Sequence, residues 1–343
     1  MTFKRKRKMM VKKFFLLFLL SQCLISCDDK KEYSRSDYLI ISETKRKEDI
    51  TSKIFCNISG GLDTLYVFSN VEYEVFFQSD EEDWVKIISE EHMSDLGATR
   101  LIIEINPMGD FDYRRRTSSL SFSSKENYLG QFISLVQGFN TRLDETFSWL
   151  RYGMADPLDE QRETLIGNWS VSEKENEWTA SDLFHDGIAY TYGKNGYVKL
   201  GSETKIGDLV TPYLTGMAND SVLLVSLDAI AYISPLNVKD NNRLTVNILS
   251  GGQFQDKSTS KTFELNYYDP VDDDLVLNMW KDGHIEFYVI SDLDNPISGT
   301  TRFQFIAGDG EPVDPEADYG QSRVFIDNVA IYVVNEDYYY LVK

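Results

Sequence analysis

Residues able to carry out chemistry are plentiful in this chain, but their spacing matches no common catalytic motif. The three histidines, His92, His185 and His284, are far apart and lack the His-Glu-x-x-His spacing that puts two imidazoles on one helical face to bind zinc. No Gly-x-Ser-x-Gly elbow of a serine hydrolase is present either. The sequence therefore argues against a zinc hydrolase and a serine hydrolase.

Carboxylates are abundant, with 55 Asp and Glu residues in 343. A glycosidase needs two of them about 5–9 Å apart, depending on mechanism, and the sequence identifies no such pair. Two acidic runs, Asp272-Asp273-Asp274 and Asp309-Gly310-Glu311 followed by Asp314, fall between expected strands and lack EF-hand spacing. We expect both runs to be solvated loops, with calcium binding as the alternative.

Aromatic residues suggest a different chemistry, the stacking of flat rings on the apolar face of a sugar. Residues 168–197 hold several aromatics in a polar setting, and Trp280 lies beside the turn-like Lys281-Asp282-Gly283. Trp178 follows an acidic run, residues 173–177, which indicates an exposed loop. Core packing is the alternative for each ring. The residues predicted to contact carbohydrate are Trp178, Trp169, Tyr190, Tyr192 and Trp280.

The amino terminus has the pattern of an export signal. Basic residues at 4–8 and 12–13 precede an apolar run, Phe14 to Leu20, that is too short to span a bilayer permanently. The sequence Leu24-Ile25-Ser26-Cys27 resembles the lipobox of bacterial lipoproteins, in which the cysteine is acylated. The acidic run after it resembles the signal that sends Bacteroidetes lipoproteins to the outer face of the outer membrane. We predict a signal peptide at 1–26 and lipidation at Cys27.

Composition limits the partners and the redox chemistry. Loss of residues 1–26 removes seven basic residues, so the charge changes from −20 to −27 (28 basic against 55 acidic residues). This acidity argues against nucleic acid and anionic lipid as partners, because like charges repel. Of three cysteines, Cys23 lies in the signal peptide and Cys27 carries lipid, so Cys56 has no disulfide partner. We expect Cys56 to be a small apolar filler.

Beyond a charged segment at 27–51, predicted to be a flexible tether, short runs rich in Val, Ile, Tyr, Phe and Thr indicate strands. Seven such runs in residues 52–138 suit an immunoglobulin-like β-sandwich. The Gly60-Gly61 pair, Asp83-Trp84-Val85, Arg115-Arg116-Thr117 and Ile133–Gln137 follow in an order that resembles a BACON domain, a module of Bacteroidetes surface proteins. The resemblance covers about 90 residues. Trp84 is expected in the core.

About eleven further strand candidates occupy residues 143–336 and predict a larger antiparallel jelly roll. They include Asp274–Met279, whereas Gly193-Lys194-Asn195-Gly196 reads as a hairpin turn. The order of Leu143–Phe147, Gly207–Pro212, Leu223–Ala229 and Val324–Ile331 resembles MAM and choice-of-anchor J jelly rolls, relatives of galactose-binding-like modules. The chain lacks the cysteines of MAM domains, which favours the bacterial branch.

The second resemblance also implies a structural calcium ion that joins the first and last strands. The matching positions are Asp144 or Glu145 and Asp327. Calcium prefers hard oxygen ligands. In the alternative, Asp327 caps a turn or pairs with a backbone amide.

Together these patterns predict an all-β, non-enzymatic lipoprotein on the outer membrane that binds a polysaccharide or glycan within a glycan-capture system and acts with other surface proteins. The alternative is an adhesion or protein-interaction module, for which a large exposed apolar patch would be expected. A glycoside hydrolase or lyase is a third possibility, which would require a cleft with two facing carboxylates.

Overall fold

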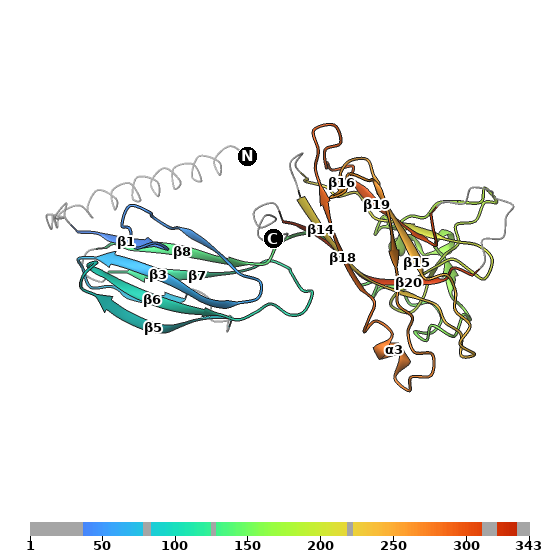
Figure 1. Cartoon of the computed structure of the whole chain (residues 1–343), viewed down its shortest axis with the longest axis horizontal. Coiled ribbons are helices and arrows are strands. Elements are labelled where there is room, and N and C mark those ends of the chain that lie inside the picture. Colours follow the sequence, from blue (N-terminus) through green and yellow to red (C-terminus); the bar gives the residue numbers. More distant parts are fainter. Residues whose placement is uncertain (1–36, 78–83, 125–127, 218–221, 311–320, 335–343) are drawn as a thin grey trace, which may run out of the picture. The chain divides into compact units, whose positions relative to one another are not determined.

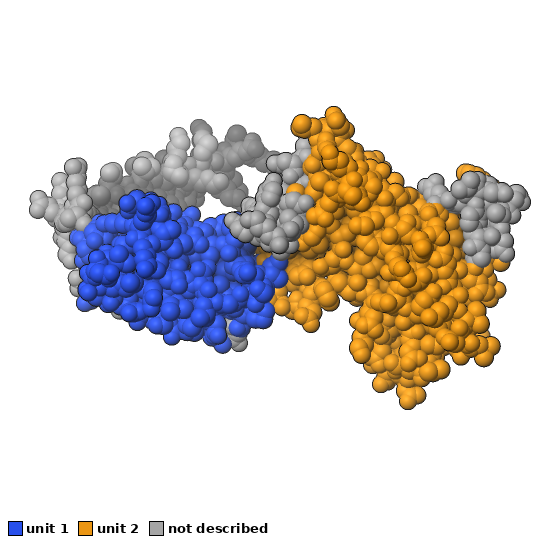
Figure 2. All heavy atoms as spheres, viewed as in Figure 1, with its two compact units in different colours: residues 1–107, 116–137 blue, residues 108–115, 138–343 orange. Residues whose placement is uncertain are grey.

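The structure, a computed structural model, describes residues 37–77, 84–124, 128–217, 222–310 and 321–334. The chain forms two compact units, coloured separately in Figure 2. Unit 1 contains residues up to 107 together with 116–137, and unit 2 contains residues 108–115 together with those from 138 onward. Both units are built almost entirely from β-strands, as predicted (Figure 1).

Unit 1 has two four-stranded sheets, in the orders β1-β3-β6-β5 and β2-β8-β7-β4. Neighbouring strands are antiparallel except β2 and β8, which are parallel. The strands are β1 (Leu39–Ser42), β2 (Lys53–Cys56), β3 (Gly61–Ser69), β4 (Glu74–Phe77), β5 (Val85–Met93), β6 (Ala98–Ile105), β7 (Arg116–Ser123) and β8 (Gly130–Gln137).

The core of unit 1 comes from alternate residues of both sheets, because successive side chains of a strand point to opposite faces. Leu101 and Ile103 from one sheet and Leu120 from the other are all fully buried. Cys56 is 7% exposed in this cluster, and burial raises the pKa of its thiol to about 12, so it is the apolar filler predicted. Trp84 is also buried in this core, as expected.

The prediction of a flexible tether over 27–51 is wrong for Leu39–Ser42. This segment is β1, which pairs with β3 in antiparallel register. Leu39 and Ile41 are buried in the core, and Ile40 between them packs against a second apolar cluster on the other face of the sheet, so a short apolar run inside a charged stretch was enough to make a strand. The part of the predicted tether before residue 37, with Cys27 and the signal peptide, lies outside the described residues.

Unit 2 has an eight-stranded sheet of order β10-β11-β12-β20-β14-β18-β16, in which β9 also pairs with β20, and a four-stranded sheet of order β13-β19-β15-β17. All these pairings are antiparallel. The strands are β9 (Asn140–Glu145), β10 (Thr164–Leu165), β11 (Thr191–Gly193), β12 (Val198–Leu200), β13 (Asp208–Val210), β14 (Val222–Ala231), β15 (Arg243–Leu249), β16 (Gln253–Phe254), β17 (Ser260–Glu264), β18 (His284–Ile290), β19 (Arg302–Ala307) and β20 (Val324–Val333).

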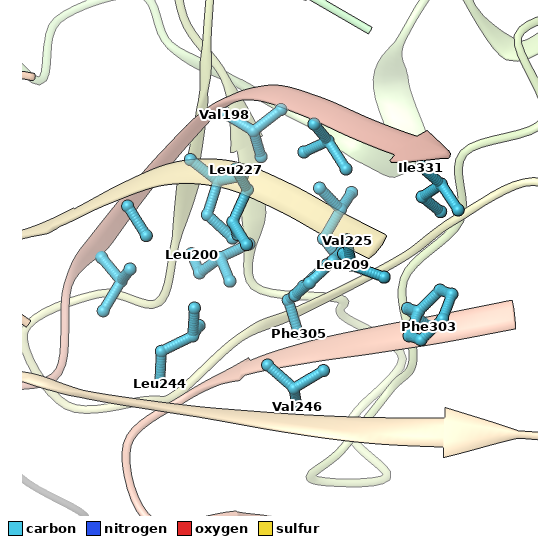
Figure 3. Close-up of a cluster of buried hydrophobic side chains, with 14 of the residues drawn as sticks. Val198, Leu200, Leu209, Val225, Leu227, Leu244, Val246, Phe303, Phe305 and Ile331 are labelled. Carbon is cyan, nitrogen blue, oxygen red and sulfur yellow. The ribbon is translucent and has the colours of Figure 1, made fainter. Parts of the chain in front are cut away.

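The core of unit 2 draws on both sheets. Figure 3 shows Val225, Leu227 and Ile331 of the large sheet near Leu244, Val246 and Phe303 of the small one. Each of these side chains is fully buried. Because β14 places Leu223, Val225 and Leu227 in this core, the residues between them belong to the other face of the large sheet. That outer face carries the candidate site.

Within the described residues, three short helices lie between the strands: a 3-10 helix at Ile166–Asn168, α2 (Val171–Lys174) and α3 (Leu275–Asn278). The strand predicted at Asp274–Met279 is therefore wrong. Leu275 and Met279, one helical turn apart, are both buried, whereas Leu277 is 79% exposed. The hairpin predicted around Gly193-Lys194-Asn195-Gly196 is confirmed, because β11 and β12 pair on either side of it.

Candidate functional site

The candidate site is a hollow of about 490 Å³ on the outer face of the large sheet of unit 2. Strand β14 contributes Ser226 and Asp228, and β18 contributes His284 at its first residue. All lining residues belong to unit 2. They are Asp110, Phe111, Asp112, Arg114, Asp144, Thr146, Ser226, Asp228, His284, Asn328, Ala330 and Tyr332.

His284 lies between two carboxylates. Its Nδ1 is 3.1 Å from Oδ1 of Asp228, and its Nε2 is 3.3 Å from Oε1 of Glu286. Strand pairing explains the first contact, because Asp228 and His284 are direct partners across β14 and β18. Burial opposes a charge on the imidazole, but the two carboxylates outweigh it and raise the pKa of His284 to about 9. The side chain is therefore an imidazolium at neutral pH.

The ring of Phe111 stacks on this imidazolium, with ring centroids 3.5 Å apart and planes inclined by 22°. Phe111 is 50% exposed, and its φ of 57° is uncommon for a bulky residue. An aromatic ring next to a cation gains electrostatic stabilisation. The exposed ring of Phe111 therefore gives the site an apolar surface next to the charged imidazolium of His284.

Arg114 occupies another wall of the hollow. Its guanidinium forms two hydrogen bonds to Asp112, at 2.9 and 3.0 Å, and contacts Oδ2 of Asp144 at 3.4 Å. Arg114 and Asp112 are both substantially exposed, so this pairing orients the side chains more than it stabilises the fold. Carboxylate and guanidinium groups both face the hollow and can hydrogen-bond hydroxyl groups.

A bulge in β20 shapes the floor. The register between β14 and β20 shifts beside Asp228, and Asn328 has a φ of 50°. This geometry lets the Asn328 amide donate a 2.7 Å hydrogen bond to Asp228. On the same bulge, burial and then the charges of Asp228 and Glu145 raise the pKa of Asp327 to about 7, although its Oδ1 accepts the backbone N–H of Asn328.

The predicted exposure of Trp178 is wrong. Trp178 and Trp169 are each 3% exposed and lie in the core of unit 2. The acidic run before Trp178 does lie at the surface, since Glu173 closes a capping box on Ser170 of α2. The backbone then turns at Glu177, with a φ of 60°, and directs Trp178 inward. Buried on all sides, neither indole presents a face to a sugar.

The other predicted aromatics are half-buried and do not converge on the hollow. The Tyr190 hydroxyl donates to Asp186 at 2.7 Å, and Tyr192 lies under Lys199, whose Nζ is 4.5 Å from the ring centroid. Trp280 packs edge-on against Tyr197, with ring centroids 5.6 Å apart. None of these three residues lines the candidate site.

Residues predicted to bind calcium are engaged in other contacts. The Glu145 carboxylate accepts three N–H groups, from the Phe147 backbone at 2.6 Å and from the indoles of Trp149 and Trp178 at 2.9 and 3.2 Å. Asp144 contacts Arg114, as described above. The described residues contain no group of three or more His, Cys, Asp or Glu side chains that could hold a metal ion. Calcium at Asp144, Glu145 and Asp327 stays a prediction, and a metal at Glu145 would have to displace these donors.

The buried side chain of Lys194 holds one long loop of unit 2 in place through hydrogen bonds. The Lys194 ammonium is fully buried and donates to the carbonyls of Asp156 and Asp159, at 3.0 and 2.6 Å. Beside it, Lys199 pairs with Glu160 and Glu163. Carbonyl and carboxylate oxygens, which could otherwise ligate a metal, thus converge on lysine side chains.

Sequence reasoning missed the site because its residues are spread over the chain. His284 is far from the other histidines in the sequence, but strand pairing places it against Asp228. Phe111 lies in the polar loop Gly109-Asp110-Phe111-Asp112, and an aromatic residue in this setting is the signal that the sequence offers.

Comparison with protein-family models and with curated proteins found no match for this chain. Among the described residues, no helix has the length and apolarity required to cross a bilayer.

Proposed function

We propose that this protein is a lipoprotein of the outer membrane surface whose second unit binds carbohydrate without transforming it. The observation that carries the proposal is the hollow on the large sheet. It combines the half-exposed Phe111 ring with carboxylates, an amide and a guanidinium. An aromatic face for the apolar side of a pyranose, next to groups that hydrogen-bond its hydroxyls, is the chemistry that sugar recognition requires.

The fold is compatible with this role and with the proposed family relations. Unit 1 is a two-sheet sandwich, as in an immunoglobulin-like BACON module, and unit 2 is a larger antiparallel sandwich, as in a jelly roll. In this interpretation unit 1 holds unit 2 away from the membrane. The ligand would be a polysaccharide or glycan, taken up together with other surface proteins.

Sugar binding can be tested by affinity electrophoresis and calorimetry of the full chain against a panel of soluble polysaccharides. For any ligand found, Phe111→Ala should weaken binding roughly three- to tenfold, since a stacked ring contributes about 0.5–1.5 kcal/mol. Tyr213→Ala is the matched control, because Tyr213 is 54% exposed in the same unit but does not line the hollow. No binding to any polysaccharide, or equal losses in both variants, would contradict the proposal.

Lipid anchoring is tested separately. Cys27→Ser should move the protein from the membrane fraction to the soluble fraction of the cell and abolish incorporation of a labelled fatty acid, because Cys27 is the proposed acylation site. Cys56→Ser is the control, since that buried thiol has no access to an acyltransferase. Membrane retention of the Cys27 variant would contradict lipidation.

A protein-interaction role is the second candidate, favoured by apolar side chains around α3. Val271 and Leu277 are 74% and 79% exposed, and a hollow of about 410 Å³ borders α3. Exposed apolar groups gathered beside a concave surface are typical of protein contact sites. If the polysaccharide panel gives no ligand, Leu277→Ser becomes the variant to compare in binding assays with purified surface proteins.

A further inference from the structure

Unit 1 carries an aromatic surface that the proposed sugar site does not use. It is the outer face of the sheet β2-β8-β7-β4, opposite the core of unit 1. Three phenylalanines project from it, Phe55, Phe76 and Phe132, with exposures of 42%, 48% and 56%. Exposed apolar side chains gathered on one sheet face can mark a contact site.

The strand register sets the spacing of these rings. Phe76 on β4 pairs with Ser121 on β7, and Ser121 pairs with Phe132 on β8, so the two rings flank one serine in a single row. Twice the inter-strand spacing puts these two Cα positions about 10 Å apart. Phe55 on β2 stands in another row, opposite Val136 of β8.

Small side chains fill the space between the rings. By strand alternation, the outer positions of β7 and β8 include Ser119, Ser121, Ser123, Gly130 and Ser134. The Ser121 hydroxyl is buried, 2% exposed, and has no hydrogen-bond partner among the described residues. The Ser121 hydroxyl is therefore enclosed within unit 1 itself, and the exposed part of this row comes from the Phe76 and Phe132 rings on either side of it.

The charge of this face, compared with that of the whole chain, indicates which partner it can contact. Lys53 and Glu74, on the two edge strands, are the charged residues that alternation places on this face within the described part of unit 1, so the face is neutral. The whole chain, by contrast, carries a net charge of −20. Two copies therefore repel through most of their surfaces but not through this one. A two-fold contact brings the same patch of both copies together, so the apolar rings of one copy would meet those of the other.

We propose that this face docks against the same face of a second copy of the chain, with the exposed phenylalanines of the two copies packed against one another. The patch spans three inter-strand gaps and about six residue steps, roughly 14 by 20 Å. This is small for a stable dimer, for which about 800 Å² per partner is usual. The contact is therefore weak and reversible, and it forms at high local concentration.

The test is sedimentation velocity of the full chain over a range of concentrations from micromolar to several hundred micromolar. The weight-average sedimentation coefficient should rise with concentration, and more so at higher salt, because screening reduces the repulsion between acidic surfaces. The double variant Phe76→Ser/Phe132→Ser should weaken association at least tenfold. A chain that stays monomeric throughout would overturn the proposal.

Two further variants make the result specific. Leu236→Ser/Leu293→Ser removes apolar side chains that are 87% and 99% exposed in unit 2, and it should leave association unchanged. Ser134→Arg should weaken association by charge repulsion while leaving every ring in place. Thermal unfolding of each variant checks that the fold is intact. Association that persists in the double phenylalanine variant, or that is lost in the leucine control, would place the contact elsewhere and overturn the proposal.

Discussion

At the scale of single residues, the charge on His284 contributes to the stability of the folded state. Asp228 and Glu286 hold it from either side, and the Tyr113 hydroxyl is hydrogen-bonded to Glu286. Its pKa, about 9, is above the value of about 6.5 expected in the unfolded chain. The charged pair therefore stabilises the folded state fully below pH 6.5 and loses this contribution as the pH rises through 9.

We expect the free energy of unfolding to fall by up to about 3 kcal/mol between pH 6.5 and 10 on account of His284. Denaturant unfolding as a function of pH measures this loss. His284→Gln should flatten that part of the profile, and His185→Gln, at an exposed position, should not. An NMR titration that gives His284 a pKa near 6.5 would contradict the ion-pair interpretation.

The neighbours of Trp178 in the sequence give a wrong prediction of its exposure. Its preceding acidic residues are at the surface, but its indole donates to Glu145 and packs on Phe147, with ring centroids 4.9 Å apart. Trp178 and Trp149 together hold the carboxylate at the end of β9. The ring predicted to bind a ligand instead ties two distant segments of unit 2 together.

At the scale of elements, most strands of both units were predictable because alternating apolar residues mark them directly. Arg243–Leu249, for example, has the predicted boundaries. Two errors have a common cause. Leu39–Ser42 and Asp274–Met279 are short segments, and short apolar runs do not distinguish strand, helix and loop by periodicity. Leu39–Ser42 is a strand because it pairs with β3. The segment Asp274–Met279 contains a helix whose Leu275 and Met279 side chains pack in the cluster of Tyr197 and Phe325.

The β11–β12 hairpin depends on a close approach at Gly193. A Cβ atom built there would lie 2.8 Å from Nε1 of Trp169 and 2.9 Å from the Tyr152 ring. Gly193→Ala should therefore displace buried rings and cost about 1–3 kcal/mol. Gly167→Ala is the matched control, since a Cβ there meets nothing within 4 Å. Chemical denaturation measures both variants, and equal stabilities would show that Trp169 can move without penalty.

At the scale of the whole molecule, the two units have separate hydrophobic cores, one around Leu101 and Ile103 and the other around Leu227 and Phe303. Units with their own cores can unfold independently. The same separation is compatible with the two proposals, in which unit 1 is the spacer and dimer contact and unit 2 binds the ligand.

Differential scanning calorimetry should resolve two unfolding transitions. Ile103→Ala should lower the temperature of one and Leu227→Ala that of the other, because each removes about 2–5 kcal/mol of packing from one core. A single transition lowered by both substitutions would show that the units unfold as one cooperative block.

The sequence by itself determined the all-β class and most strand positions, because composition and alternation are local properties that need no knowledge of the fold. Only the tertiary structure decided which side chains meet. Asp228, His284 and Asn328 come together through strand pairing across 100 residues, and the Trp178 ring turns inward after one residue of positive φ. Such contacts depend on register and backbone direction, and these are fixed only when the sheets close around their cores.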